Sequence, residues 1–139
     1  MRPWLRSLPL VLAVAIAGCG QPASSAGDFK GAKKDVADTI EELQTAAQNR
    51  KPADICSEVL SRALVEKVKT SGGGDCVDEM EKVVGDADDF ELDVTAVTIT
   101  GATATARVKA RKDGKDGALT SYRLAREDGK WRLSDLGAQ

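Results

Sequence analysis

The side chains best suited to chemistry in this chain are three cysteines, Cys19, Cys56 and Cys76, because the sequence contains no histidine. The absence of histidine removes the usual general acid or base near neutral pH and the commonest metal ligand. Neither Cys56 nor Cys76 has a partner at the spacing of a zinc site or of a Cys-x-x-Cys redox motif. These thiols are therefore left with alkylation or disulfide formation, and we expect no metal or other cofactor.

Cys19 follows a segment with the features of an export signal. Arg2 and Arg6 give the segment a positive start, and residues 8–17 form a short apolar stretch. A helix needs roughly 20 apolar residues to cross a bilayer, so this stretch is too short to span one. Its length is typical of a signal peptide, and we expect residues 1–18 to be removed from the mature protein.

The run Ile16-Ala17-Gly18-Cys19 resembles the lipobox of bacterial lipoproteins. The resemblance implies that the Cys19 thiol carries a diacylglyceryl group and that the chain is cut before it. Two acyl chains anchor a protein stably, so we expect a domain attached to a membrane of the cell envelope, outside the cytoplasm. Residues 19–27, without a helical or strand period, would form a flexible tether. The alternative is an ordinary cleaved signal peptide followed by an incidental cysteine.

With Cys19 assigned to lipid, Cys56 and Cys76 remain as one pair. Disulfides persist in exported proteins. Closing a loop of about 20 residues stabilises a fold by roughly 3 kcal/mol in the chain-entropy description. We therefore predict a Cys56–Cys76 disulfide, with two separate buried thiols as the alternative.

The elements that must position these residues begin with helices. Apolar residues recur every three or four positions over residues 28–48, which predicts an amphipathic helix. Pro52 suits the first turn of a second helix. Ser61 and Asp75 are candidate N-caps of two shorter helices. The predicted disulfide would tie the second helix to the last.

From Phe90 the period of apolar residues changes to two, which predicts strands. Val97 and Ile99 fall out of phase with the residues before them, which indicates a β-bulge. Further strands are predicted over 102–111 and 118–126 and from 131 onward. The sequences Asp113-Gly114 and Asp116-Gly117 indicate a turn, and residues 127–130 a tight hairpin. Helices followed by an antiparallel meander predict one α+β domain over residues 28–136.

This order of elements, ending in Asp128-Gly129-Lys130-Trp131-Arg132-Leu133, resembles the nuclear transport factor 2-like (cystatin-like) superfamily, and in particular its small exported lipoproteins. The resemblance covers residues 28–136. It implies a cone in which N-terminal helices pack on a curled four-stranded antiparallel sheet. Enzymes of the superfamily, such as ketosteroid isomerases, use Asp, His or Tyr pointing into the cone. Here Tyr122 is the only tyrosine, and Asp93 is in phase with the outer face, so we expect no enzymatic activity.

Two other patterns lack the residues that their functions need. The glycine run 72–74 has no following Lys-Ser/Thr and no preceding strand, so it does not predict a phosphate-binding loop. The acidic run 86–93 has glutamate at 91 and valine at 97, where an EF-hand needs glycine and glutamate. These segments are expected to be a connector and a solvated turn.

The distribution of charged residues limits the partners that the domain can bind. The chain carries a net charge of −2, which argues against nucleic acid as a partner. Arg107, Lys109 and Arg111 share one strand face, which the residues Arg123, Arg126 and Arg132 could extend. Such a face could bind anionic lipid or a protein partner, or it could be an ordinary solvated surface.

We expect a non-catalytic envelope lipoprotein that binds a small apolar ligand or an envelope protein. The alternatives are a structural lipoprotein that uses the basic face and, third, an enzyme of the superfamily. A cavity would favour the first class over the second, and a buried Asp or Tyr inside it would favour the third. The sequence predicts no individual ligand-binding residue.

Overall fold

The computed structural model describes residues 25–137, and the predicted signal peptide, the lipobox and the first part of the tether lie outside them. Its elements, in chain order, are η1 (Ser25–Asp28), α1 (Ala32–Gln48), α2 (Pro52–Asp54), the π-helical turn η2 (Ile55–Val59), α3 (Arg62–Gly72), α4 (Cys76–Val84), β1 (Phe90–Thr100), β2 (Thr103–Lys112), β3 (Lys115–Glu127) and β4 (Lys130–Asp135). A chain that begins at Gly20 would therefore keep every described element.

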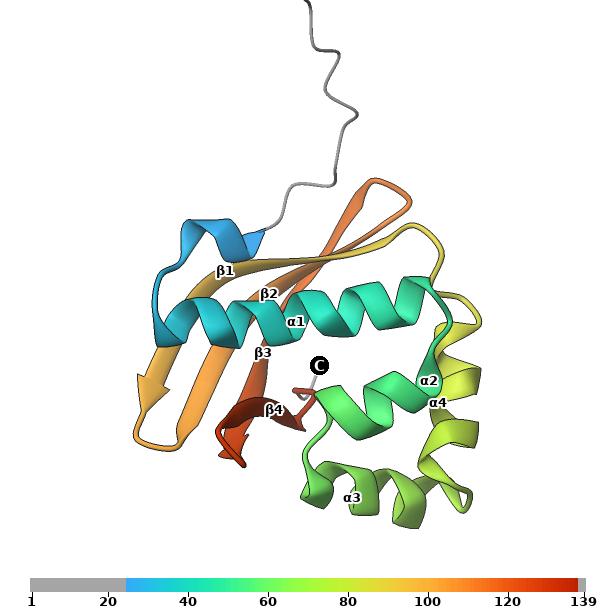
Figure 1. The fold of residues 1–139 in the computed structure, drawn as a ribbon. Helices are drawn as coiled ribbons and strands as arrows, with labels where there is room; N and C mark the ends of the chain where they lie inside the picture. Colours follow the sequence, from blue (N-terminus) through green and yellow to red (C-terminus); the bar gives the residue numbers. More distant parts are fainter. Residues whose placement is uncertain (1–24, 138–139) are drawn as a thin grey trace, which may run out of the picture.

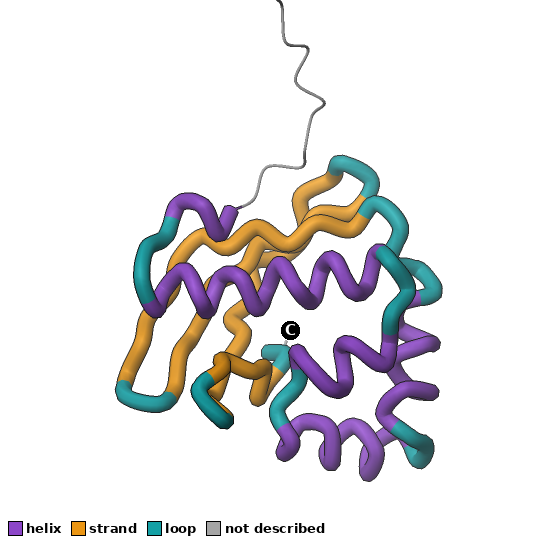
Figure 2. Tube along the Cα trace, in the orientation of Figure 1, coloured by secondary structure: helices purple, strands orange, loops and turns teal. Residues whose placement is uncertain are grey.

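The strands form one antiparallel sheet in the order β1-β2-β3-β4, which confirms the predicted α+β class and meander. The sheet is curled, and α1 lies across its concave face (Figure 1). The helices α2, α3 and α4 gather at the C-terminal end of α1 (Figure 2). The molecule therefore has one end where α1 meets the sheet directly and another where a group of short helices covers it.

The N-terminal boundary of the packed structure differs from the expected one. Helix α1 begins at Ala32 rather than near Asp28, because Gly31 before it has a positive φ of 60°. Ser25 and Ala26, which the expected tether included, are buried. The Ser25 hydroxyl accepts a hydrogen bond from the Val94 amide at 3.1 Å, so the packed structure starts three residues earlier than predicted.

Helix η2 is the least predictable element of the helical group. Pro52 opens α2 as expected, but the chain continues as a π-helical turn. After this turn Leu60 is extended and forms a parallel bridge with Leu133 at the edge of β4. The Ser61 hydroxyl then caps α3 by accepting the Leu64 amide at 3.1 Å, as its position predicts. Asp75 occupies the N-cap position of α4 without a side-chain hydrogen bond.

The register of the strands confirms one sequence prediction and corrects another. The pairing of β1 with β2 shifts between Val94 and Ala96, at the predicted bulge. Strand β3 begins at Lys115, so Asp116-Gly117 belongs to the strand and not to a turn. The turn is confined to Asp113 and Gly114, whose φ values of 52° and 70° are those of a tight type I′ hairpin.

Candidate binding cavity

A cavity of about 580 Å³ lies between the sheet and the helical group. Helix α1 contributes Leu43 and Ala47 to its wall, and η2 and α4 contribute Ile55 and Met80. Strands β2 and β3 contribute residues of their inner faces, namely Ala110, Ala118, Thr120 and Tyr122. Most of these side chains are apolar, and the volume lies within the range of about 300–1,000 Å³ found for small-molecule sites.

Small side chains on the sheet are one reason for this space. The inner face of β2 is filled by Ala104, Ala106 and Val108, which are almost completely buried under α1. Further along the same face Ala110 is only half-buried, and Ala118 on β3 is exposed. The methyl groups of Ala110 and Ala118 are too small to reach the covering helices, so a space remains between the sheet and these helices.

Tyr122 is the one aromatic hydroxyl in the cavity wall. Its side chain is half-buried, and no hydrogen bond joins its hydroxyl to any of the described residues. No polar side-chain atom within residues 25–137 is both buried and without a partner, so this hydroxyl is accessible. Burial raises the pKa of Tyr122 above its ordinary value of 10.0, so the phenol is neutral at physiological pH. It can donate a hydrogen bond to a carbonyl or ether oxygen of a ligand.

The charged residues of the cavity lie at its rim. Asp86 and Lys112 line the opening, and both side chains are exposed to solvent. Val83 and Leu136 also border it and are 65% and 39% exposed. The cavity is thus apolar inside and charged only where it meets water.

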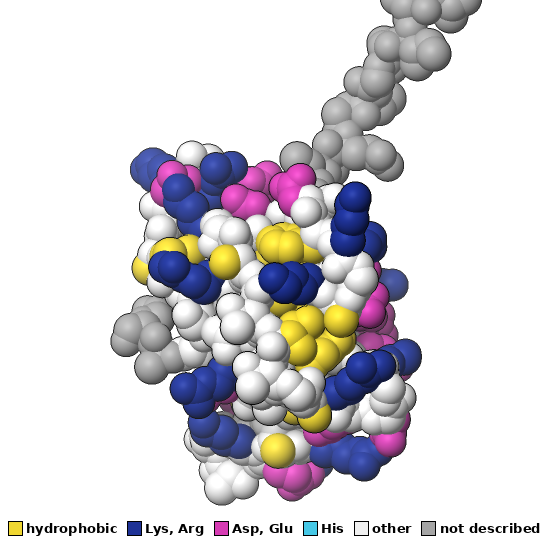
Figure 3. Space-filling view, turned by 90° about the vertical axis from the view of Figure 1, so that its left-hand side faces the viewer, with side chains coloured by type: hydrophobic (Ala, Val, Ile, Leu, Met, Phe, Trp, Pro, Cys, Tyr) yellow, Lys and Arg dark blue, Asp and Glu magenta, His cyan; other side chains and the backbone are white. Residues whose placement is uncertain are grey.

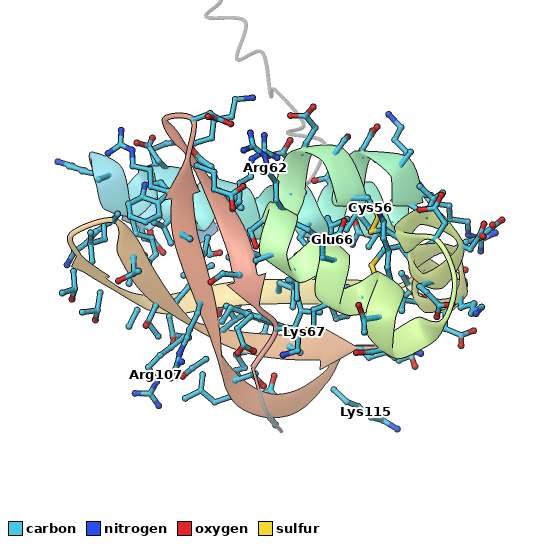
Figure 4. The ribbon with its side chains drawn as sticks, turned by 90° about the horizontal axis from the view of Figure 1, so that it is seen from below. Cys56, Arg62, Glu66, Lys67, Arg107 and Lys115 are labelled. Carbon is cyan, nitrogen blue, oxygen red and sulfur yellow. A yellow bond between two sulfur atoms is a disulfide. The ribbon has the colours of Figure 1, made fainter. Side chains whose placement is uncertain are left out.

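The predicted disulfide is present, and its Cys56 follows the cavity-lining Ile55 in the chain. Cys56 in η2 is bonded to Cys76 at the start of α4, with their Cα atoms 6.2 Å apart. Figure 4 shows the bond in yellow beside α3. A second, more polar groove of about 570 Å³ lies on the other side of η2, and its lining includes Cys56, Arg62 and Glu66. The Cys56 side of the disulfide therefore lies in the groove wall.

The outer face of the sheet is less basic than predicted. Lys109 and Arg111 both donate to the carboxylate of Asp116, a residue that lies in β3 and not in the predicted turn. These hydrogen bonds, that from Lys109 first, lower the pKa of Asp116. In the pairing of β1 with β2, Glu91 and Asp93 lie opposite Arg111 and Lys109. Figure 3, which views the molecule from the left-hand side of Figure 1, shows Lys and Arg side chains scattered among acidic and uncharged ones.

Two arginines that could have extended the basic face have other contacts. The guanidinium of Arg126 lies 5.9 Å from the centre of the Trp131 ring. Arg132 donates to the Ser57 carbonyl at 2.6 Å, within the polar groove. The sequence could not place these residues because the curl of the sheet turns β4 toward the helical group.

The structure brings few of the sequence-predicted site residues together. Cys19 lies outside the described residues, whereas Cys56 and Cys76 are bonded. Asp93 does not line the cavity, in keeping with its strand phase. Tyr122 does line the cavity. It lies two residues before Leu124 on the same strand, so strand alternation predicts that both side chains face inward. Among residues 25–137, no group of three potential ligands could hold a metal ion, and no helix is long and apolar enough to span a membrane.

Comparisons with known proteins give similar shapes and no relative. No family model matches the sequence, and no curated protein matches it significantly. A de novo designed NTF2 (nuclear transport factor 2) fold protein, NT-9, has a TM-score of 0.49 and 13% identity, over 76% of this chain and 85% of that one. A proposed NTF2-like transpeptidase from Campylobacter jejuni has a TM-score of 0.44 and 19% identity, over 69% and 94%.

A third similar structure is a de novo designed protein with a curved β-sheet, with a TM-score of 0.42 and 15% identity, over 70% of this chain and 92% of that one. NTF2-like folds are thus among the shapes that resemble this chain. Likenesses at this level carry no argument about activity.

Proposed function

We propose that this chain is an exported lipoprotein, held at a membrane of the cell envelope by lipid on Cys19, whose domain binds a small apolar ligand without catalysing a reaction. The observation that carries the binding function is the apolar cavity of about 580 Å³ at the covered end of the sheet. The lipobox sequence supports the anchor. The two parts of the proposal are independent and need separate tests.

The side chains that line the cavity indicate what kind of ligand it would bind. An apolar body fits the space between Leu43, Ile55 and Met80, and burying it there is favourable by about 25 cal/mol per Å² of apolar surface. One hydrogen-bond acceptor on the ligand would meet the Tyr122 hydroxyl. Charged or strongly polar groups would stay at the rim with Asp86 and Lys112.

A binding role is favoured over catalysis because, among residues 25–137, the cavity places no acidic or basic side chain beside Tyr122 with which it could transfer a proton. Its raised pKa keeps the phenol protonated near neutral pH, so Tyr122 acts there as a hydrogen-bond donor and not as a base. Asp86, the one carboxylate in the cavity lining, is exposed at the rim and not inside the cavity. The site can hold and orient a carbonyl compound, but it lacks the buried base that an isomerase or hydrolase needs.

The binding function is tested with the apolar fluorescent probe N-phenyl-1-naphthylamine and a chain that begins at Gly20. We expect saturable binding that Ala118→Phe weakens strongly, because a phenyl ring at this position takes up part of the cavity. Leu119→Phe is the matched control, since Leu119 is the next residue of the same strand, faces outward and is 48% exposed. Equal loss in both variants, or no saturable binding at all, would refute the function.

The anchor is tested by the intact mass of the full chain purified from the membranes of an expressing bacterium. We expect a species that begins at Cys19 and carries a diacylglyceryl group. The Cys19→Ala variant should lose that modification and the membrane attachment. A soluble, unmodified wild-type product would contradict the anchor and leave the ligand-binding function untouched.

A further inference from the structure

We propose that the Cys56–Cys76 disulfide is a redox-sensitive clasp on the ligand cavity: it holds α4 in the cavity wall, and its reduction by a dithiol releases α4 and the ligand. The inference rests on the proposed ligand-binding function, which it extends to regulation of the same site. It is carried by the position of the bond between the two hollow regions of the domain.

The segment η2 and Leu60 form the partition between the cavity and the polar groove. Ile55 lines the cavity, whereas Cys56 and Ser57 line the groove, and Leu60 lines both. The sulfur bridge therefore starts at the groove side of a wall whose other side contacts the ligand space. A reagent in the groove can reach this bond without first passing through the cavity.

The other end of the bond holds a helix that packs on the other short helices and not on the sheet, with Met80 and Val84 buried among them. Cys76 is the first residue of α4, and Met80, Val83 and Val84 of the same helix line the cavity. The contacts of α4 are with α2, η2 and α3, and it has little contact with the sheet. Within residues 25–137, no ion pair joins α4 to another element, because Lys82 pairs with Glu79 of the same helix. Apart from the backbone, the disulfide is the covalent link between α4 and the rest of the described residues.

The groove gives a dithiol access to the Cys56 sulfur. Cys56 is half-buried, whereas Cys76 is 2% exposed. The groove is open to solvent between α3 and the β3–β4 hairpin, and in Figure 4 Arg62 and Glu66 lie on the α3 side of it. Attack on a disulfide takes place at the accessible sulfur, so Cys56 is the expected point of exchange.

The exchange is an ordinary two-electron transfer. A thiolate of the dithiol attacks the Cys56 sulfur and forms a mixed disulfide, while Cys76 leaves as a thiolate and takes up a proton. The second thiol of the reagent displaces Cys56, which is also protonated. The reagent ends as a disulfide and the protein as two thiols. Released from Cys56, α4 can move away from the cavity as a local opening that leaves the sheet intact.

The test compares the oxidised and the dithiothreitol-reduced chain from Gly20. We expect the dissociation constant for N-phenyl-1-naphthylamine to rise by about tenfold on reduction, because a closed wall is then present in only a minor fraction of molecules. Reoxidation should restore it. A Cys56→Ser/Cys76→Ser variant should bind as weakly as the reduced protein and should not respond to dithiothreitol.

Hydrogen exchange shows whether reduction releases α4 alone or destabilises the whole domain. It also gives a result that does not depend on probe binding. On reduction, amides of residues 76–84 should lose protection while those of β2 and β3 keep it. Unchanged protection of α4, or loss in the sheet as well, would overturn the clasp. If the oxidised chain binds no probe, the ligand-binding function fails, and the exchange data still decide whether reduction frees α4.

Discussion

The two halves of helix α1 lie against the same sheet, yet only one of them is fully packed. In the N-terminal half, Val36, Ala37 and Ile40 are completely buried. In the C-terminal half, Leu43 and Ala47 line the cavity. We call these the filled end and the hollow end. The difference arises from what each half meets on its other sides.

The filled end is enclosed by segments that are tied to it by hydrogen bonds. The Thr39 hydroxyl donates to the Trp131 carbonyl of β4 at 3.2 Å, and the Ala26 amide of η1 donates to the Glu41 carboxylate at 2.9 Å. The hollow end is also tied to β1, by hydrogen bonds of Gln44 and Gln48. On its other side α2, η2 and α4 pack largely on one another, and η2 also contacts β4. Because the side chains at the filled end are completely buried and the hollow end borders the cavity, we expect substitutions at the filled end to cost more stability.

The largest expected effect is on the free energy of unfolding when one side chain is truncated at each end of α1. Ile40→Ala removes atoms from a closed core and should lower the free energy of unfolding by about 2–5 kcal/mol. Leu43→Ala only enlarges a space that is already open, so its cost should be no more than about 1 kcal/mol. Urea denaturation of both variants measures the difference.

The same pair should behave in the opposite order in probe binding. Leu43→Ala removes part of the cavity wall and should weaken N-phenyl-1-naphthylamine binding, whereas Ile40→Ala should leave the affinity of the remaining folded protein unchanged. If both substitutions cost the same stability, the hollow end is as well packed as the filled end and the contrast is wrong.

The sequence predicts the filled end better than the hollow one. Val36 and Ile40 follow the helical period, and Ala104, Ala106 and Val108 follow the strand period, so their burial can be anticipated from spacing alone. The caps and the bulge are also local signals. Ser61 is followed by a helix, and the phase change before Val97 requires an extra residue in the strand.

The hollow end depends on distances that no local pattern encodes. An alternating strand shows that Ala118 and Tyr122 share a face, but not how far the covering helices stand from it. That distance is set by the π-helical turn η2 and by the bridge of Leu60 to Leu133, which join segments far apart in the chain. The cysteines are the exception, because the assignment of Cys19 to lipid and the expectation of export leave Cys56 and Cys76 as one pair.

Titration of Tyr122 sharpens the comparison from inside the hollow end. It is the only tyrosine, so phenolate absorbance reports it alone. Because burial raises its pKa above 10.0, the midpoint should lie above that value in the folded chain and return to it in urea. A raised folded pKa contributes stability that is fully present below pH 10 and is lost as the pH rises through the folded value.

Ligand should increase this shift if the cavity is where it binds. Saturating N-phenyl-1-naphthylamine displaces water around the phenol, and the midpoint should rise further. Tyr122→Phe should abolish the titration and the alkaline loss of stability that comes from it. A midpoint at the ordinary value, with or without probe, would place the hydroxyl in bulk solvent and outside the ligand site.

The smallest expected effect is on the outer face, where Asp116 holds Lys109 and Arg111. Asp116→Asn should lower the stability at neutral pH slightly, since the pair is exposed and screened by water. The lowered pKa of Asp116 means that its contribution is present above the ordinary carboxyl pKa and is lost as the pH falls through the lowered one. The difference between the two proteins in urea denaturation should therefore vanish in acid.

The same variant decides whether this face can act as a basic docking surface. With Asp116 replaced, Lys109 and Arg111 lose the carboxylate that neutralises them, and binding to vesicles that contain phosphatidylglycerol should increase relative to the wild type. Asp113→Asn is the matched control, because it removes the same charge from the adjacent hairpin, where asparagine tolerates the positive φ of 52°. Equal vesicle binding by all three proteins would mean that the outer face is inert whether or not its cations are paired, and the cavity would be left as the surface on which the domain acts.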